Sequence, residues 1–141
     1  ITLHGAQYHI RLITYVQGRL WAKANPKTSV LRHDLGHKAG ALTKALLDFA
    51  PNPSKSDSHW DLANAPWSCK HTMLFKGEKR TLIKRFQSLF KAIESCHKTL
   101  PKSTIHADVN DYNIIISNNL KNLEVAGIID FGDTTYSQTI N

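Results

Sequence analysis

Residues 105–116 read IHADVNDYNIII, a polar loop that leads into a short apolar run. A turn-rich segment follows, and then EVAGIIDFGD at residues 124–133, in which a second apolar run ends at Asp130. Two short apolar runs joined by turn residues predict a β-hairpin. Because the start of one strand lies beside the end of the other in an antiparallel hairpin, we expect Asn113 and Asp130 to lie close together. Asp108 stands in the loop over the same end, so three oxygen-bearing side chains are expected to converge there.

This set of oxygen ligands suits magnesium and phosphoryl transfer. Mg²⁺ prefers hard oxygen ligands and commonly takes only one or two of them from the protein, so Asn113 and Asp130 are candidate Mg²⁺ ligands. Phosphoryl transfer also needs a carboxylate that accepts the proton of the attacking hydroxyl, and Asp108 is the candidate for that base. His106 belongs to the same catalytic loop, where we expect its ring to brace the backbone rather than to take the proton. Each residue alone is also compatible with an ordinary turn or cap, but the order HxDxxxxN, hairpin, IDFGD favours the functional interpretation.

The HADVNDYN and IIDFGD motifs resemble the catalytic loop and the metal-binding segment of the aminoglycoside phosphotransferase family, which includes choline, ethanolamine, homoserine and hydroxylysine kinases. The segment IRLITYVQG at residues 10–18 is similar to the hinge between the two lobes of that family, so the resemblance spans nearly the whole chain. It implies an enzyme that uses ATP and Mg²⁺, with Asp108 as catalytic base and with Asn113 and Asp130 as Mg²⁺ ligands. It also implies an adenine site at the hinge backbone, near Thr14, Tyr15 and Val16.

The fold class that we expect is α+β: the C-terminal lobe of a protein-kinase-like fold, mainly helical, with a small β-hairpin that carries the catalytic motifs. The β-branched and aromatic residues of 9–16 predict a strand, and residues 51–67, rich in Pro, Asn, Ser and Asp, predict a long loop. Apolar side chains at helical spacing predict one helix over residues 31–49, after a cap at Thr28-Ser29, and another over residues 78–97.

The domain boundaries that we expect are a hinge strand at residues 1–18, which belongs to a separate N-terminal lobe, and the C-terminal lobe itself at residues 19–141. The sequence opens at Ile1, ends soon after the IDFGD motif and contains no GxGxxG arrangement. A glycine-rich loop covers the nucleotide phosphates in kinases. We therefore expect residues 1–141 to need the other lobe as a partner and to show little turnover alone.

The expected acceptor is a hydroxyl group of a small, amino-bearing molecule. Asp61 and Asp111 are candidate substrate residues, because an ammonium group that leaves water needs a partner of opposite charge. Trp60 is a candidate wall of the substrate site, although anchoring is the favoured role for both Trp60 and Trp67. For Asp61 the structural and the substrate-binding roles remain equally open.

The Asn110–Asn113 form of the motif and the Trp60-Asp61-Leu62 segment are most similar to the hydroxylysine-kinase branch of the family. Some members of that branch are fused to a class III aminotransferase, so pyridoxal phosphate is expected only where such a domain shares the polypeptide. The alternative function is a non-catalytic, kinase-like module that binds a ligand within a larger fusion enzyme. The intact Asp108, Asn113 and Asp130 argue against this alternative.

Charge and composition argue against nucleic-acid binding, membrane contact and a zinc site. The 18 basic and 11 acidic side chains give a net charge of +7, but the basic residues are scattered, which favours a solvated surface over a nucleic-acid partner. No membrane contact is expected, because no apolar run approaches the roughly 18 residues of a membrane span. Cys69 and Cys96 form no CxxC pair, which is typical of a reducing, cytoplasmic location. HDLGH at residues 33–37 imitates the zinc-binding HExxH motif, but Asp34 is shorter than glutamate, and surface histidines are favoured.

Overall fold

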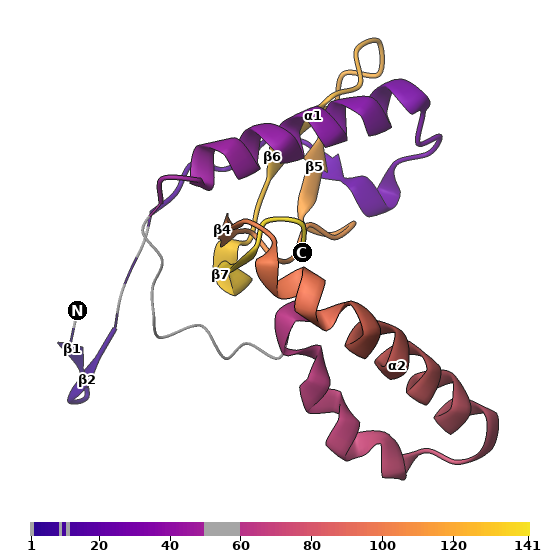
Figure 1. Cartoon of the computed structure of the whole chain (residues 1–141). Helices are drawn as coiled ribbons and strands as arrows, with labels where there is room; N and C mark the ends of the chain where they lie inside the picture. Colours follow the sequence, from indigo (N-terminus) through magenta and orange to yellow (C-terminus); the bar gives the residue numbers. More distant parts are fainter. Residues whose placement is uncertain (1, 9, 11, 50–59) are drawn as a thin grey trace.

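The computed structural model describes residues 2–8, 10, 12–49 and 60–141, and the chain in these ranges mixes helices with small antiparallel sheets (Figure 1). The α+β class expected from the sequence is therefore confirmed, as far as the mixture of elements defines it. In chain order the elements are β1 (Thr2–Leu3), β2 (Ala6–Gln7), β3 (Arg19–Leu20), the 3₁₀-helix η1 (Trp21–Lys23), α1 (Ser29–Leu46), the 3₁₀-helix η3 (Leu62–Leu74), α2 (Gly77–Thr99), β4 (Lys102–Ile105), β5 (Ile114–Ile116), β6 (Val125–Ile128), the 3₁₀-helix η4 (Phe131–Asp133) and β7 (Thr135–Gln138).

The segments around the HADVNDYN and IIDFGD motifs are held by two antiparallel strand pairs. β5 pairs with β6, with Ile114 opposite Ile128, and β3 pairs with the other edge of β5. β4 pairs with β7, with Ile105 opposite Thr135. The β5–β6 hairpin predicted from the sequence is confirmed. Because β4 leads into the loop at residues 106–113 and β6 leads into residues 129–134, both pairings bring these two segments together.

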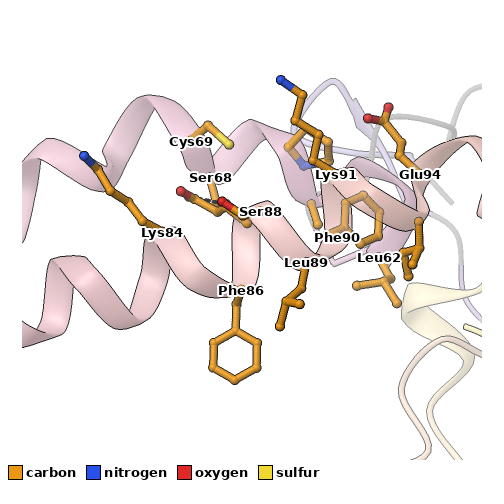
Figure 2. Close-up of a pocket in the computed structure, with 14 residues that line it drawn as sticks. Leu62, Ser68, Cys69, Lys84, Phe86, Ser88, Leu89, Phe90, Lys91 and Glu94 are labelled. Atoms are coloured by element: carbon orange, nitrogen blue, oxygen red, sulfur yellow. Dashed lines mark hydrogen bonds between the residues drawn. The ribbon is translucent and has the colours of Figure 1, made fainter.

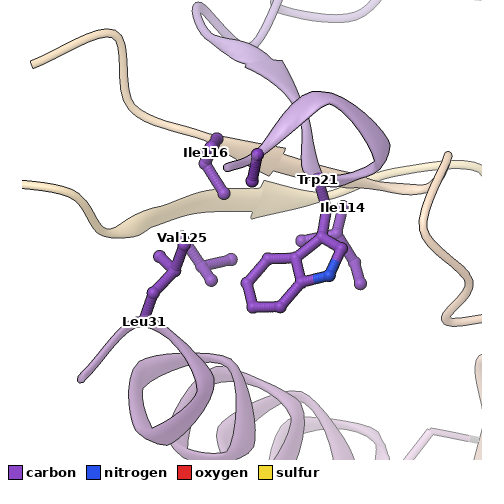
Figure 3. Packing of buried hydrophobic residues seen from close by; sticks show 6 residues of the cluster. Trp21, Leu31, Ile114, Ile116 and Val125 are labelled. Carbon is purple, nitrogen blue, oxygen red and sulfur yellow. The ribbon is translucent and has the colours of Figure 1, made fainter. Parts of the chain in front are cut away.

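The apolar core lies between α1 and the three-stranded sheet. Figure 3 shows the Trp21 ring and the Leu31 side chain on the side of the sheet that faces α1, against residues of β5 and β6. Leu31, Ile116 and Val125 are almost completely buried. α1 begins where the Thr28 side chain accepts a hydrogen bond from the Leu31 amide at 3.2 Å, an N-cap of the kind predicted.

Two polar features fix how α1 and the preceding segment meet the sheet. Asp34 on α1 accepts a hydrogen bond from the Val125 amide at 2.6 Å, so a helix side chain satisfies a backbone donor of β6. Gly18 approaches β5 so closely that an added Cβ would lie 2.3 Å from the Ile116 carbonyl oxygen. Only glycine permits such an approach of backbone to backbone.

η3 and α2 form a second, separate helical layer that extends away from the sheet (Figure 1). The Gln87 amide nitrogen on α2 lies 2.9 Å from the Thr72 hydroxyl and 3.3 Å from the Ser68 hydroxyl, both on η3. The Arg80 guanidinium donates to two backbone carbonyls at the end of η3. The predicted helix over residues 78–97 is confirmed, but four of its apolar side chains remain 54–62% exposed: Leu82, Phe86, Leu89 and Ile93.

Two local predictions differ from the structure. Residues 10 and 12–16 form no strand, and Leu12 is fully exposed; residues 9 and 11 of that predicted strand lie outside the described residues. A β-strand needs a neighbour to accept and donate its backbone hydrogen bonds, and no described strand pairs with this segment. The predicted loop at 51–67 lies outside the described residues up to 59, and from Leu62 onward it is helical. The Asp61 carboxylate accepts the Ala63 amide at 3.0 Å and so starts η3.

Within the described ranges, no helix has both the length and the apolar character required to span a bilayer.

Candidate active site

The hairpin register brings the loop at residues 106–113 to the end of β6. The Ile129 amide donates to the Asn113 carbonyl at 2.9 Å, which places the backbone of Asn113 beside the residue that precedes Asp130. Residues 106–113 form the connection from β4 to β5, so Asp108 lies in the loop above this point. The approach of these segments follows from the antiparallel pairing, as the sequence predicts.

The Asp108 carboxylate is held by two amide side chains. The Asn113 Nδ2 donates to Asp108 Oδ2 at 2.8 Å and to the Asp108 carbonyl at 2.9 Å, and the Asn110 Nδ2 donates to Asp108 Oδ1 at 2.7 Å. Because both groups that Asn113 contacts are acceptors, the nitrogen of its amide must face Asp108. Its Oδ1 therefore points away from Asp108. No hydrogen bond to this oxygen is observed from the described part of the chain.

His106 braces the loop against the hairpin. Its Nδ1 accepts the Asp108 amide at 3.2 Å, and its Nε2 lies 2.9 Å from the Ile129 carbonyl oxygen. A backbone amide can only donate and a carbonyl can only accept, so these partners select the neutral imidazole with its proton on Nε2. The buried ring also packs against Phe131, with 4.6 Å between the ring centroids. With both nitrogens engaged, His106 has the geometry of a bracing residue rather than of a proton acceptor.

Two residues around the site have left-handed backbone conformations. Ala107, directly before Asp108, has φ 64°, and Asp130 has φ 62° and ψ 74°. For a residue with a Cβ, this conformation costs roughly 1–2 kcal/mol, and such departures cluster at functional sites. The Asp130 Oδ1 accepts the Gly132 amide at 3.2 Å, which caps η4, and the residue is exposed to solvent.

A hollow of about 220 Å³ opens beside Asp108 and is lined by Trp60, Ala107, Asp108 and Asp133. Among the described residues neither Asp108 nor Asp133 forms an ion pair. The residues that line the hollow therefore include two acidic residues and a tryptophan, types of side chain that favour a cation. Sequence reasoning chose Trp60 as a substrate-site candidate but not Asp133. The signal for Asp133 was its place in the DFGD turn, three residues after Asp130.

The other two predicted substrate residues are engaged elsewhere. Asp61 is buried, and its Oδ1 accepts the Ser137 hydroxyl at 2.7 Å and the Asn141 amide at 3.1 Å, besides capping η3. Asp111 is exposed and pairs with the Lys27 ammonium at 2.7 Å. Neither lines the hollow beside Asp108. For Asp61 these contacts describe a structural role, and its role as a substrate residue stays a prediction.

The three predicted adenine-site residues differ in how they meet the sheet. Thr14 and Tyr15 are exposed. Val16 is half-buried and packs on β6, so that a Cβ added to Gly127 would lie 3.1 Å from its Cγ1. The absence of a side chain at Gly127 thus leaves room for Val16 beside β6. Gly127 lies two residues before Ile129, so Val16 packs near the end of β6 that leads to Asp130.

A larger groove, of about 800 Å³, lies between η3 and α2 (Figure 2). Its walls are mainly apolar and include Leu62, Leu89 and Phe90, together with Cys69. It contains neither Asp108, Asn113 nor Asp130. Its charged and polar lining residues include Lys84, Lys91 and Glu94, but the candidate base Asp108 lies only at the smaller hollow, so size alone does not choose between the two as a candidate site.

The imitation of a zinc motif on α1 does not assemble a ligand cluster. His33 and His37 are exposed, and Asp34 is hydrogen-bonded to the backbone of β6. In the part of the chain that the structure describes, no three His, Cys, Asp or Glu side chains gather in a way that could hold a metal ion.

A model of the phosphotransferase enzyme family matches residues 2–139, which is nearly the whole chain. Comparisons with curated proteins and with solved structures give no match.

Proposed function

Since the chain belongs to the phosphotransferase enzyme family, we propose that it carries the catalytic loop of an ATP-dependent kinase that phosphorylates a hydroxyl group of a small, amino-bearing molecule. The single observation that carries this proposal is the Asp108 carboxylate, oriented by Asn110 and Asn113 and open to the adjacent hollow. A carboxylate in such a place can accept the proton of a bound hydroxyl as that oxygen attacks the terminal phosphoryl group.

The orientation of Asp108 is the main contribution of the loop. Each of its carboxylate oxygens accepts one amide hydrogen bond, from Asn110 and from Asn113. Every carboxylate oxygen has two acceptor positions, so each retains one for the hydroxyl of an acceptor. Holding a base at a fixed angle converts an encounter into an intramolecular proton transfer and lowers the entropic part of the barrier.

The donor set beside Asp108 fits Mg²⁺. The Oδ1 of Asn113 points away from Asp108, and Asp130 presents a carboxylate at the exposed end of β6. Both are hard oxygen ligands, and a kinase site needs only one or two of them because the nucleotide phosphates and water complete the octahedron. When bound, the ion would neutralise the phosphate charge that develops during transfer.

An amino-bearing acceptor is supported by the hollow itself. Asp108 and Asp133 give it negative charge in a chain of net charge +7, and the Trp60 indole forms part of its wall. An ammonium group is stabilised by both features. Nucleotide binding is proposed at residues 14–16, of which Val16 rests on the same sheet as the hairpin.

The proposal is tested by Mg²⁺-dependent ATP consumption of the full native polypeptide with a panel of amino alcohols and hydroxy amino acids. We expect one class to stimulate turnover and Asp108→Asn to lower kcat by about 10²–10⁴-fold, the usual contribution of a general base. Asp48→Asn is the matched control, because Asp48 is an exposed aspartate outside the site. A flat panel in a folded protein that binds ATP would point instead to a non-catalytic ligand-binding module.

A further inference from the structure

The catalytic loop is held from outside its own motif. The Lys27 ammonium donates to Asp111 Oδ2 at 2.7 Å, and the Ala22 amide donates to the Asp111 carbonyl at 2.9 Å. Both donors come from residues 21–28, about 85 positions earlier in the chain, between β3 and α1. One segment thus forms hydrogen bonds with both the side chain and the backbone of Asp111.

This segment has a fixed position. Trp21 is buried in the core against Ile114, the first residue of β5. Lys27 directly precedes Thr28, the N-cap of α1, and its ammonium also lies 5.6 Å from the centre of the Trp21 ring. The ammonium is therefore presented from a backbone that the core and the helix cap hold in place, rather than from a free surface lysine.

These contacts to Asp111 lie within the loop at residues 106–113, which carries Asp108 and Asn113 and is called the reactive loop below. Asp111 lies three residues after Asp108 and two before Asn113. The loop between them includes the hydrogen bond from the Asn113 amide to the Asn110 carbonyl, at 3.0 Å. It also follows Ala107, whose left-handed backbone other contacts must maintain. The Lys27 and Asp111 side chains are 31% and 54% exposed, so the pair adds little to global stability. Its effect must be local.

We propose that Lys27 is a positioning residue, which holds Asp111 and thereby fixes the loop that presents Asp108 and Asn113. The proposal deepens the kinase function and, for its kinetic part, rests on it. It also assigns to Asp111 a role in the shape of the loop, in place of the substrate contact expected from the sequence.

Amide hydrogen exchange tests the positioning without any substrate. We expect Lys27→Met to raise the exchange rates of the Ala22 and Asn113 amides by about threefold to tenfold, because both amides depend on the closed loop. Asp111→Asn should give the same pattern. Lys23→Met is the matched control, since Lys23 is exposed on η1 and should leave both rates unchanged. In the native chain, 0.5 M salt should have a similar effect, because exposed ion pairs are screened. Rates in Lys27→Met equal to those of the control would overturn the proposal.

Kinetics then separate this inference from the proposed reaction. With the acceptor found in the panel, Lys27→Met should lower kcat by about threefold to tenfold with the KM for ATP unchanged, and Lys27→Arg should restore most of it. Faster exchange in Lys27→Met, in a protein whose native form shows no turnover with any acceptor, would support the loop contact and contradict the kinase function. Unaltered exchange and kcat in Lys27→Met, in a protein that does phosphorylate an acceptor, would reject the positioning role and leave the kinase function standing.

Discussion

The sheet with α1 and the helical pair of η3 and α2 are built differently. In the first region Leu31 and Ile116 are completely buried, and the side chains of α1 pack on β6. In the second, apolar side chains at positions 82, 86, 89 and 93 of α2 are more than half exposed, and polar contacts such as those of Gln87 join the helices. Asp108, Asn113 and Asp130, the proposed base and Mg²⁺ ligands, lie beside the strands of the first region. Tight packing on one side of the molecule is what holds the reactive loop.

The two regions should therefore respond differently to the same substitution, and leucine gives the largest contrast. Leu31→Ala empties a fully buried position between α1 and the sheet and should lower the free energy of unfolding by about 2–5 kcal/mol. Leu89→Ala truncates a side chain that is 54% exposed in the wall of the groove between η3 and α2 and should lower it by only about 1 kcal/mol. Urea denaturation of both variants measures the difference. Equal losses of unfolding free energy in the two variants would mean that Leu89 is as closely packed in solution as Leu31.

Glycines offer a second contrast, within the packed region. Gly18→Ala brings a Cβ within 2.3 Å of the Ile116 carbonyl oxygen, so β3 must separate from β5, at a cost of about 1–3 kcal/mol. Gly40→Ala on α1 meets no atom within 4 Å and should stabilise the protein by about 0.5–1 kcal/mol through helix propensity. Thermal unfolding should thus shift in opposite directions. A neutral Gly18→Ala would show that the approach of β3 to β5 is adjustable.

The same division explains what the sequence could predict. The hairpin and the approach of Asn113 to the Asp130 end depend on strand register, which is a local property of the chain. The α1 helix depends on periodic leucines and a Thr28 cap, and both can be identified directly in the amino-acid sequence. By contrast, residues 12–16 have the composition of a strand, but a strand also needs a partner, and none of the described strands supplies it.

Side-chain roles at the site were harder to predict than its backbone. Asp61 and Asp111 are carboxylates near the motifs, so sequence reasoning made both of them candidates for substrate binding. Within the chain, their side chains contact Ser137 and Lys27, which lie 76 and 84 positions away. No local pattern encodes such pairings, because they arise only when the chain has folded. Asp133, which also lines the hollow, differs from these two, because its place in the DFGD turn is a local signal.

The smallest expected effect lies in the helical pair and tests whether polar contacts really join it. Gln87 contacts Thr72 and Ser68 across the interface. Gln87→Ala should therefore cost about 0.5–1.5 kcal/mol, the net worth of such hydrogen bonds. The loss should be regional: amide exchange should quicken along α2 and η3 while the amides of β5 and β6 stay protected, because opening in one cooperative unit need not open another. Ser88→Ala, one residue along the same helix and exposed, controls for helix propensity. If exchange quickened equally in β5, the two regions would unfold as one unit, and the independence drawn from their different packing would be wrong.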